Sequence, residues 1–115
     1  MRKDLAMPAG KLAAQAGHAY TDALVHAQET DPSRDELYRS KGIGGSKVTM
    51  YAKNQNALIK AYELAKDADI PCALIVDQHH ILPPYFDGNP VITALGLGPC
   101  TQKESRFITK RFNCV

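Results

Sequence analysis

Four polar residues near the start of the sequence recur at helical spacing and could take part in acid–base or ester chemistry. They are Lys11, Gln15, His18 and Asp22, at positions i, i+4, i+7 and i+11. Residues at such intervals share one face of an α-helix, and we expect this face to lie opposite an alanine-rich stripe. Lys11 would stand in the first turn, where free backbone N–H groups and the helix dipole favour an anion. The polar face of an ordinary amphipathic helix explains the same pattern.

Asp77 is a second candidate, because it directly follows the apolar run 72–76. Such a run is typical of a central strand covered on both faces. Open α/β sheets bind ligands at the carboxyl ends of their strands. A carboxylate at that place could act as a general base or orient a water molecule. It could equally cap the turn that follows.

The elements that would position these residues alternate between helix and strand. We predict helices over 9–28, 33–40 and 102–110 and a further helix that begins after Asn54, an N-cap residue. We predict strands over 47–52, 72–76 and 91–97 from their β-branched and apolar content. The alternation predicts a three-layer α/β/α sandwich with helices on both faces of the sheet.

The helix predicted over 9–28 has an apolar stripe of mainly small residues that would let it lie close to the sheet. The stripe consists of Leu12, Ala16, Ala19, Ala23 and Ala27. Gly17 in the same helix lowers helix propensity by about 1 kcal/mol, and we expect a tight contact there.

Composition sets the broad class. The chain of 115 residues is long enough for one domain over 1–115 with its own core. Its content of 44% hydrophobic and 23% charged residues is typical of globular proteins, and no run is long and apolar enough for a bilayer. We therefore expect a soluble, cytoplasmic protein. The three scattered cysteines favour reduced structural thiols.

The net charge of +2 is too small to indicate nucleic-acid binding by itself. Basic residues do gather towards the two ends of the chain, as Arg2, Lys3, Lys11, Lys103, Arg106, Lys110 and Arg111. If the ends meet in the fold, these residues could form a patch that attracts phosphate. A solvated surface of mixed charge is an equally good interpretation.

Several motifs, taken together and in this order, resemble the archaeal and eukaryotic-type (type II) peptidyl-tRNA hydrolases. The opening residues read R-x-D-L from Arg2, and the first helix reads G-K-x-A-A-Q-x-x-H-A from Gly10. A strand beginning with Lys47-Val48, the strand-ending Asp77 and a T-x-L-x-x-G-P pattern from Thr93 follow. The resemblance extends over most of the chain.

This resemblance implies a mixed four-stranded sheet between helices and hydrolysis of the ester that joins a peptide to the terminal ribose of tRNA. The expected partner is peptidyl-tRNA, with no membrane and no cofactor, and a homodimer is plausible. Carried over by position, the catalytic residues are Lys11, His18, Asp77 and Thr93. The substrate-binding residues are Arg2, Gln15 and Lys47.

The expected roles follow from what ester hydrolysis requires. Asp77 would orient or deprotonate water, and Lys11 would hold a phosphate or stabilise negative charge. Thr93 and Gln15 would position groups by hydrogen bonds. An ion pair between Lys11 and Asp77 could instead be purely structural, and His18 could equally be a packing residue.

The segment 78–90 departs from the family pattern, in which A-G-R-T-Q-x-x-P-G usually follows the aspartate. Here it is several residues longer, lacks the glycine and arginine, and has Ile81 where a threonine is expected. Tyr85 and Phe86 could stack on the acceptor end of tRNA or simply anchor the loop.

The altered segment leaves two other functions open. One is a non-catalytic relative that binds tRNA, another RNA or a protein. The other is a small-molecule or metal-dependent hydrolase, with Asp77, His79, His80 and Asp87 as conceivable zinc ligands. Adjacent residues of an extended segment point in opposite directions, so His79 and His80 would not readily bind one ion, and we expect no metal site.

Overall fold

A computed structural model describes residues 1–40, 45–78, 81–84 and 86–115 of the chain. Its elements are α1 (Ala9–Thr30), α2 (Pro32–Arg39), β1 (Met50–Tyr51), α3 (Gln55–Asp67), β2 (Cys72–Asp77), β3 (Ile81–Leu82), β4 (Phe86–Asp87), β5 (Val91–Leu97), α4 (Gln102–Thr109) and β6 (Asn113–Cys114). The mixture of helices and strands confirms the α/β class. None of the described helices is both long and apolar enough to span a membrane.

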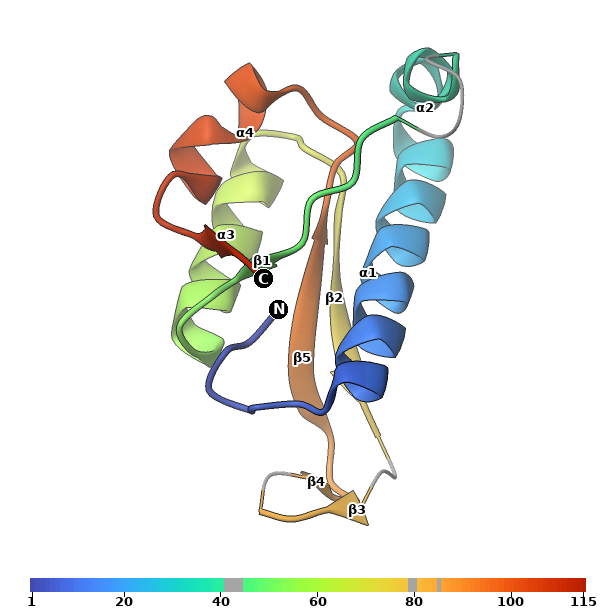
Figure 1. The fold of residues 1–115 in the computed structure, drawn as a ribbon. Coiled ribbons are helices and arrows are strands. Elements are labelled where there is room, and N and C mark those ends of the chain that lie inside the picture. The colour runs from blue at the N-terminus through green and yellow to red at the C-terminus, as the bar shows by residue number, and fades with distance from the viewer. Residues whose placement is uncertain (41–44, 79–80, 85) are drawn as a thin grey trace.

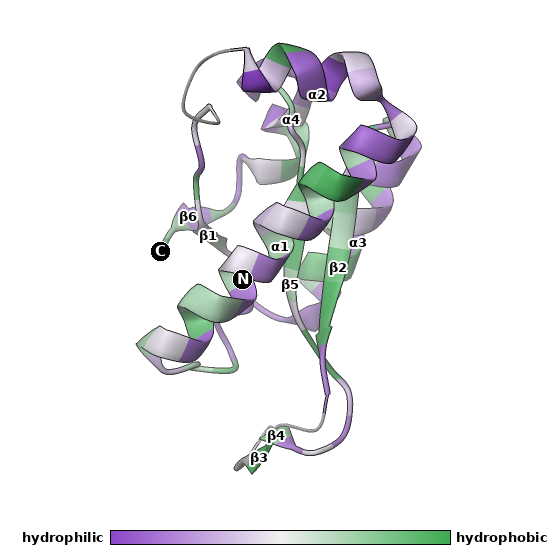
Figure 2. Cartoon of the chain, turned by 90° about the vertical axis from the view of Figure 1, so that its right-hand side faces the viewer, coloured by the Kyte–Doolittle hydropathy of each residue, from purple (hydrophilic) through white to green (hydrophobic). Residues whose placement is uncertain are grey.

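The helices cover both faces of the β2–β5 pair. α1 packs against both strands from one side and α3 from the other, and α4 lies against α3 (Figure 1). The second view looks onto α1, behind which the largely apolar strands β2 and β5 run (Figure 2). The apolar run of β2 therefore reflects helices on its two faces, as the sequence indicated.

The close approach of α1 to the sheet depends on small residues, but not on the one expected. Ala19, Ala23 and Ala27 are buried, which confirms the predicted stripe. Gly17 is exposed, and an added Cβ there would meet nothing within 4 Å, so the predicted tight contact is wrong. The tight contact occurs at Gly96 of β5, where a Cβ would collide with the carbonyl oxygen of Ala19.

The predicted single sheet of four strands is not found in the described part of the chain. The strands instead form three antiparallel pairs, β1–β6, β2–β5 and β3–β4. The predicted strand 47–52 is reduced to Met50–Tyr51. Within the described residues, β5 is the only strand that pairs with β2. Apolar patterning reports which faces are covered, whereas neighbours in the plane of a sheet are set by backbone hydrogen bonds.

The first residues link two of these pairs. The Arg2 amide donates to the Thr93 carbonyl at 3.1 Å, and the Ala52 amide donates to the Met1 carbonyl at 2.7 Å. Met50 also pairs with Cys114 of β6, so both ends of the chain lie beside β1 (Figure 1). The two ends therefore meet, and Arg2 lies next to Thr93.

Candidate active site

An ion pair between α1 and β2 forms the centre of the site. Lys11 stands in the first turn of α1, and Asp77 is the last residue of β2. The Lys11 Nζ lies 2.7 Å from the Asp77 Oδ2, and the side chains retain only 10% and 16% of their exposure. The packing of α1 on β2 thus joins two of the predicted catalytic residues.

Phe86 supplies a third contact to this ion pair. The Lys11 Nζ lies 4.3 Å from the centre of the Phe86 ring. The ring is 2% exposed and belongs to the core cluster that contains Leu5, Ile75 and Ala94. An ammonium over an aromatic face is attracted by the ring quadrupole, by about 2 kcal/mol when the pair is desolvated. Phe86 therefore holds the lysine in place.

Sequence reasoning did not assign Phe86 to the site. Phe86 and Tyr85 are adjacent aromatics of the same segment, and the sequence alone predicts the same alternatives for both. The one available signal was position, because Phe86 lies in the segment that returns from Asp77 to β5. Tyr85 lies outside the described residues.

A buried hydrogen bond connects two more of the predicted residues, Thr93 and Gln15. The Thr93 Oγ1 donates to the Gln15 Oε1 at 2.6 Å, and both residues are buried. Gln15 faces the sheet because it precedes Ala19 and Ala23 at intervals of four residues. The prediction that the polar face lies opposite the alanine stripe is therefore wrong for Gln15.

A pocket of about 410 Å³ lies between α1 and β2 and is bordered by Gln15 and Asp77. Its lining residues come from both elements and are Gln15, His18, Asp22, Leu74, Ile75, Val76 and Asp77. His18 and Asp22 are exposed on α1. Five of the predicted residues thus lie at this place. Lys11 bonds to Asp77 and Thr93 bonds to Gln15, and Gln15, His18 and Asp77 line the same pocket.

Arg2 makes its bonds within the protein. Its guanidinium donates to both carboxylate oxygens of Asp4, at 2.7 and 3.1 Å, and to the Ile92 carbonyl at 2.9 Å. The hydrogen bond from Arg2 is the largest cause that lowers the pKa of Asp4. The substrate-binding role of Arg2 stays a prediction. In the fold, Arg2 links the first residues to β5 through hydrogen bonds to the carbonyls of Ile92 and Thr93.

Lys47 lies apart from the Lys11–Asp77 pair. It is exposed, its Nζ lies 5.8 Å from the centre of the Tyr38 ring, and it lines a different and larger cavity. The structure does not bring Lys47 together with the other predicted residues.

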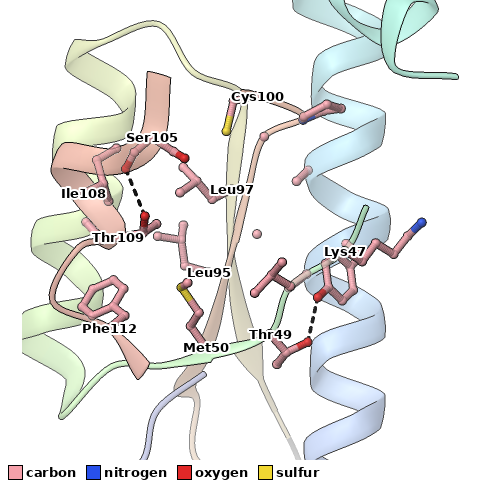
Figure 3. A pocket seen from close by; sticks show the side chains of 18 of the residues that line it. Lys47, Thr49, Met50, Leu95, Leu97, Cys100, Ser105, Ile108, Thr109 and Phe112 are labelled. Atoms are coloured by element: carbon pink, nitrogen blue, oxygen red, sulfur yellow. Dashed lines mark hydrogen bonds between the residues drawn. The ribbon is translucent and has the colours of Figure 1, made fainter. Parts of the chain in front are cut away.

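This larger cavity, of about 580 Å³, lies between α1, β5 and α4 (Figure 3). Leu95, Leu97, Ile108 and Phe112 are among its apolar lining residues. The hydroxyl groups of Tyr20 and Thr49 form a hydrogen bond of 2.7 Å in its wall. No described carboxylate lines this cavity, whereas Asp22 and Asp77 line the smaller pocket.

The alternative zinc site depended on His79 and His80, which lie outside the described residues. Within the described ranges, no three His, Cys, Asp or Glu residues are grouped so that they could hold a metal ion. Asp77 makes its ion pair with Lys11.

The comparisons with known proteins agree on one family. The family model described as peptidyl-tRNA hydrolase PTH2 matches residues 1–115. A peptidyl-tRNA hydrolase of Methanocaldococcus jannaschii is 35% identical over 111 residues, which cover 95% of this chain and 90% of the relative. Those of Methanococcus vannielii and Methanopyrus kandleri are 33% and 34% identical, and the matches cover 100% and 95% of this chain and 94% and 88% of the relatives. The chain belongs to the peptidyl-tRNA hydrolase PTH2 family.

Proposed function

We propose that this protein hydrolyses the ester bond of peptidyl-tRNA, or of an N-blocked aminoacyl-tRNA, and releases the peptide and free tRNA. The single observation that carries the proposal is the shielded Lys11–Asp77 pair at the pocket between α1 and β2. Family membership supports the same reaction.

In the proposed step, Asp77 accepts a proton from a water molecule that enters this pocket. The water oxygen forms a bond to the carbonyl carbon of the ester, and the bond from that carbon to the ribose oxygen breaks. The ribose oxygen takes up the proton that Asp77 accepted, so the products are a peptide acid and tRNA with a free terminal hydroxyl, and Asp77 returns to its carboxylate form. Asp77 suits this role because the pair uses its Oδ2 and the side chain still borders the pocket.

Lys11 and Gln15 would stabilise the negative charge that develops on the carbonyl oxygen. An ammonium has three N–H donors, and Asp77 and the Phe86 ring face it from two sides. The Gln15 Oε1 accepts from Thr93, which turns the amide N–H groups of Gln15 away from that bond. Thr93 is thus a positioning residue. Removing one hydrogen-bond donor that stabilises the oxyanion typically lowers the kcat of an enzyme by about 10²–10³-fold.

The test of this function is release of a labelled N-acetylated amino acid from tRNA by the wild-type protein, with and without a chelator. We expect multiple turnovers, intact tRNA as the second product and the same rate in chelator. Salt-sensitive tRNA binding without release would favour the non-catalytic alternative. Activity abolished by the chelator would favour a metal-dependent hydrolase.

Phe86→Leu should lower kcat for the same substrate by about two- to thirtyfold, because an aromatic face contributes about 0.5–2 kcal/mol to holding a cation. KM should change little. Phe86→Tyr keeps the ring face and should retain most of the activity, and thermal unfolding shows whether both variants fold alike. Equal losses in the leucine and tyrosine variants at equal stability would contradict a role for the ring in positioning Lys11.

The homodimer stays a prediction that the family resemblance implies. The cytoplasmic location stays a prediction that follows from the proposed substrate, which translation supplies. Light scattering on the purified protein tests the first, and cell fractionation tests the second.

A further inference from the structure

The segment that begins at α4 carries a cluster of exposed cations. Lys103 and Arg106 lie in α4, and Lys110 and Arg111 directly follow its last residue. Residues 103, 106 and 110 are spaced i, i+3 and i+7, which places their side chains on one face of the helix. All four side chains are exposed.

These cations are not neutralised by neighbouring acids. None of the four forms an ion pair with a carboxylate of the described residues. Glu104, the one acidic residue of α4, is engaged by Arg34 of α2 through bonds of 3.0 and 2.9 Å. Hydrogen bonding from Arg34 is the main reason why the pKa of Glu104 lies below its usual value. The positive charge of α4 is therefore available to a partner.

The layer on the other face of the β2–β5 pair has the opposite charge balance. Residues 9–39, which form α1 and α2, contain three Lys or Arg and five Asp or Glu, a balance of −2. Residues 102–111 contain four Lys or Arg and one Glu, a balance of +3. An approaching polyanion would be steered to the α4 side rather than to α1 and α2.

An exposed aromatic ring lies among the same cations. Phe107 follows Arg106 in α4 and is 47% exposed. Aromatic rings between basic side chains are typical of surfaces that bind nucleic acids, because bases or sugars stack on the ring while phosphates meet the cations.

We propose that this face, defined by Lys103, Arg106, Phe107, Lys110 and Arg111, binds the phosphate backbone of a tRNA arm whose terminal ribose lies at the Lys11–Asp77 pair. The proposal rests on the proposed function. α4 lies at the opposite end of the molecule from the first turn of α1 and the β3–β4 hairpin (Figure 1). The molecule is 42 Å long. Both places lie within this length, so one A-form RNA arm that runs along the molecule can contact both.

The test compares two substrates that share the same N-acetylated aminoacyl ester. One is the full-length tRNA, and the other is the 3′-terminal trinucleotide alone. For Arg106→Gln/Lys110→Gln we expect a KM for the full-length substrate raised several-fold, with kcat unchanged. The slope of log KM against log salt should fall by about 2, one for each lost phosphate contact. Kinetics on the trinucleotide should match those of the wild type.

A variant with the same change in net charge on the opposite layer is the control. Gln28→Glu/Ser33→Glu adds two negative charges at exposed positions of α1 and α2 and should leave the salt slope unchanged. An equal rise in KM in this control would overturn the proposal, as would an unchanged KM in the α4 variant. A changed oligomeric state with unchanged KM would also overturn it, in favour of a protein contact.

Failure of the proposed function is distinguishable from failure of this inference. If the wild type releases nothing from either substrate, the proposed function fails. Fluorescence anisotropy of labelled tRNA then still tests the inference. Weaker and less salt-sensitive binding by the α4 variant would support tRNA binding at this face, and binding equal to that of the wild type would contradict it.

Discussion

Asp77→Asn should lower kcat for blocked aminoacyl-tRNA by about 10²–10⁴-fold, the usual contribution of a positioned general base. Asparagine has nearly the shape of aspartate but cannot accept the proton of the attacking water. The affinity for tRNA should remain close to that of the wild type, since Asp77 bears no positive charge. The measurement is single-turnover release at saturating protein, together with tRNA binding.

The substitution also leaves the shielded Lys11 ammonium without its counterion. Breaking a buried ion pair from one side costs about 3–5 kcal/mol, so circular dichroism must show that the variant is folded at the assay temperature. Asp87→Asn is the matched control, because Asp87 is exposed and accepts a bond from the Asn89 amide. Asp77→Asn activity within a few-fold of the Asp87→Asn value would rule out Asp77 as the base.

Lys11→Met should lower kcat by about 10²–10³-fold, because methionine keeps an unbranched side chain but has no charge or donor for the developing oxyanion. KM should rise only modestly if the ammonium acts mainly in the transition state. Steady-state kinetics on blocked aminoacyl-tRNA separate the two parameters.

Lys60→Met, an exposed cation on α3, is the control for the loss of one positive charge. A raised KM with unchanged kcat in Lys11→Met would contradict the proposed role. Lys11 would then serve to bind phosphate in the ground state.

Local signals predicted the helices well, and they predicted the sheet less well. The Asn54 side chain accepts from the Ala57 amide at 3.0 Å and begins α3 as expected. The strand over 47–52 was predicted too long, because β-branched residues indicate an extended backbone and not its pairing partners. The sequence does not predict that residues 1–3 link β1 to β5, because three residues are too few to show a periodicity.

The site residues that belong to the family motifs could be predicted from the sequence. Lys11, Gln15, Asp77 and Thr93 come from three separate segments, and only their joint resemblance to a family indicated that the fold gathers them. Phe86 could not be found in this way, because it lies in the segment that departs from the family pattern. Its contact with Lys11 depends on where the β3–β4 hairpin returns to the core.

If Lys11 and Asp77 act as one unit in cleaving the ester, a double-mutant cycle will show it. Single-turnover release is measured for the wild type, Lys11→Met, Asp77→Asn and the double variant. Residues that act together lose activity non-additively, so we expect a double variant about as slow as the slower single variant. Losses that multiply, or a wild type without release, would contradict it.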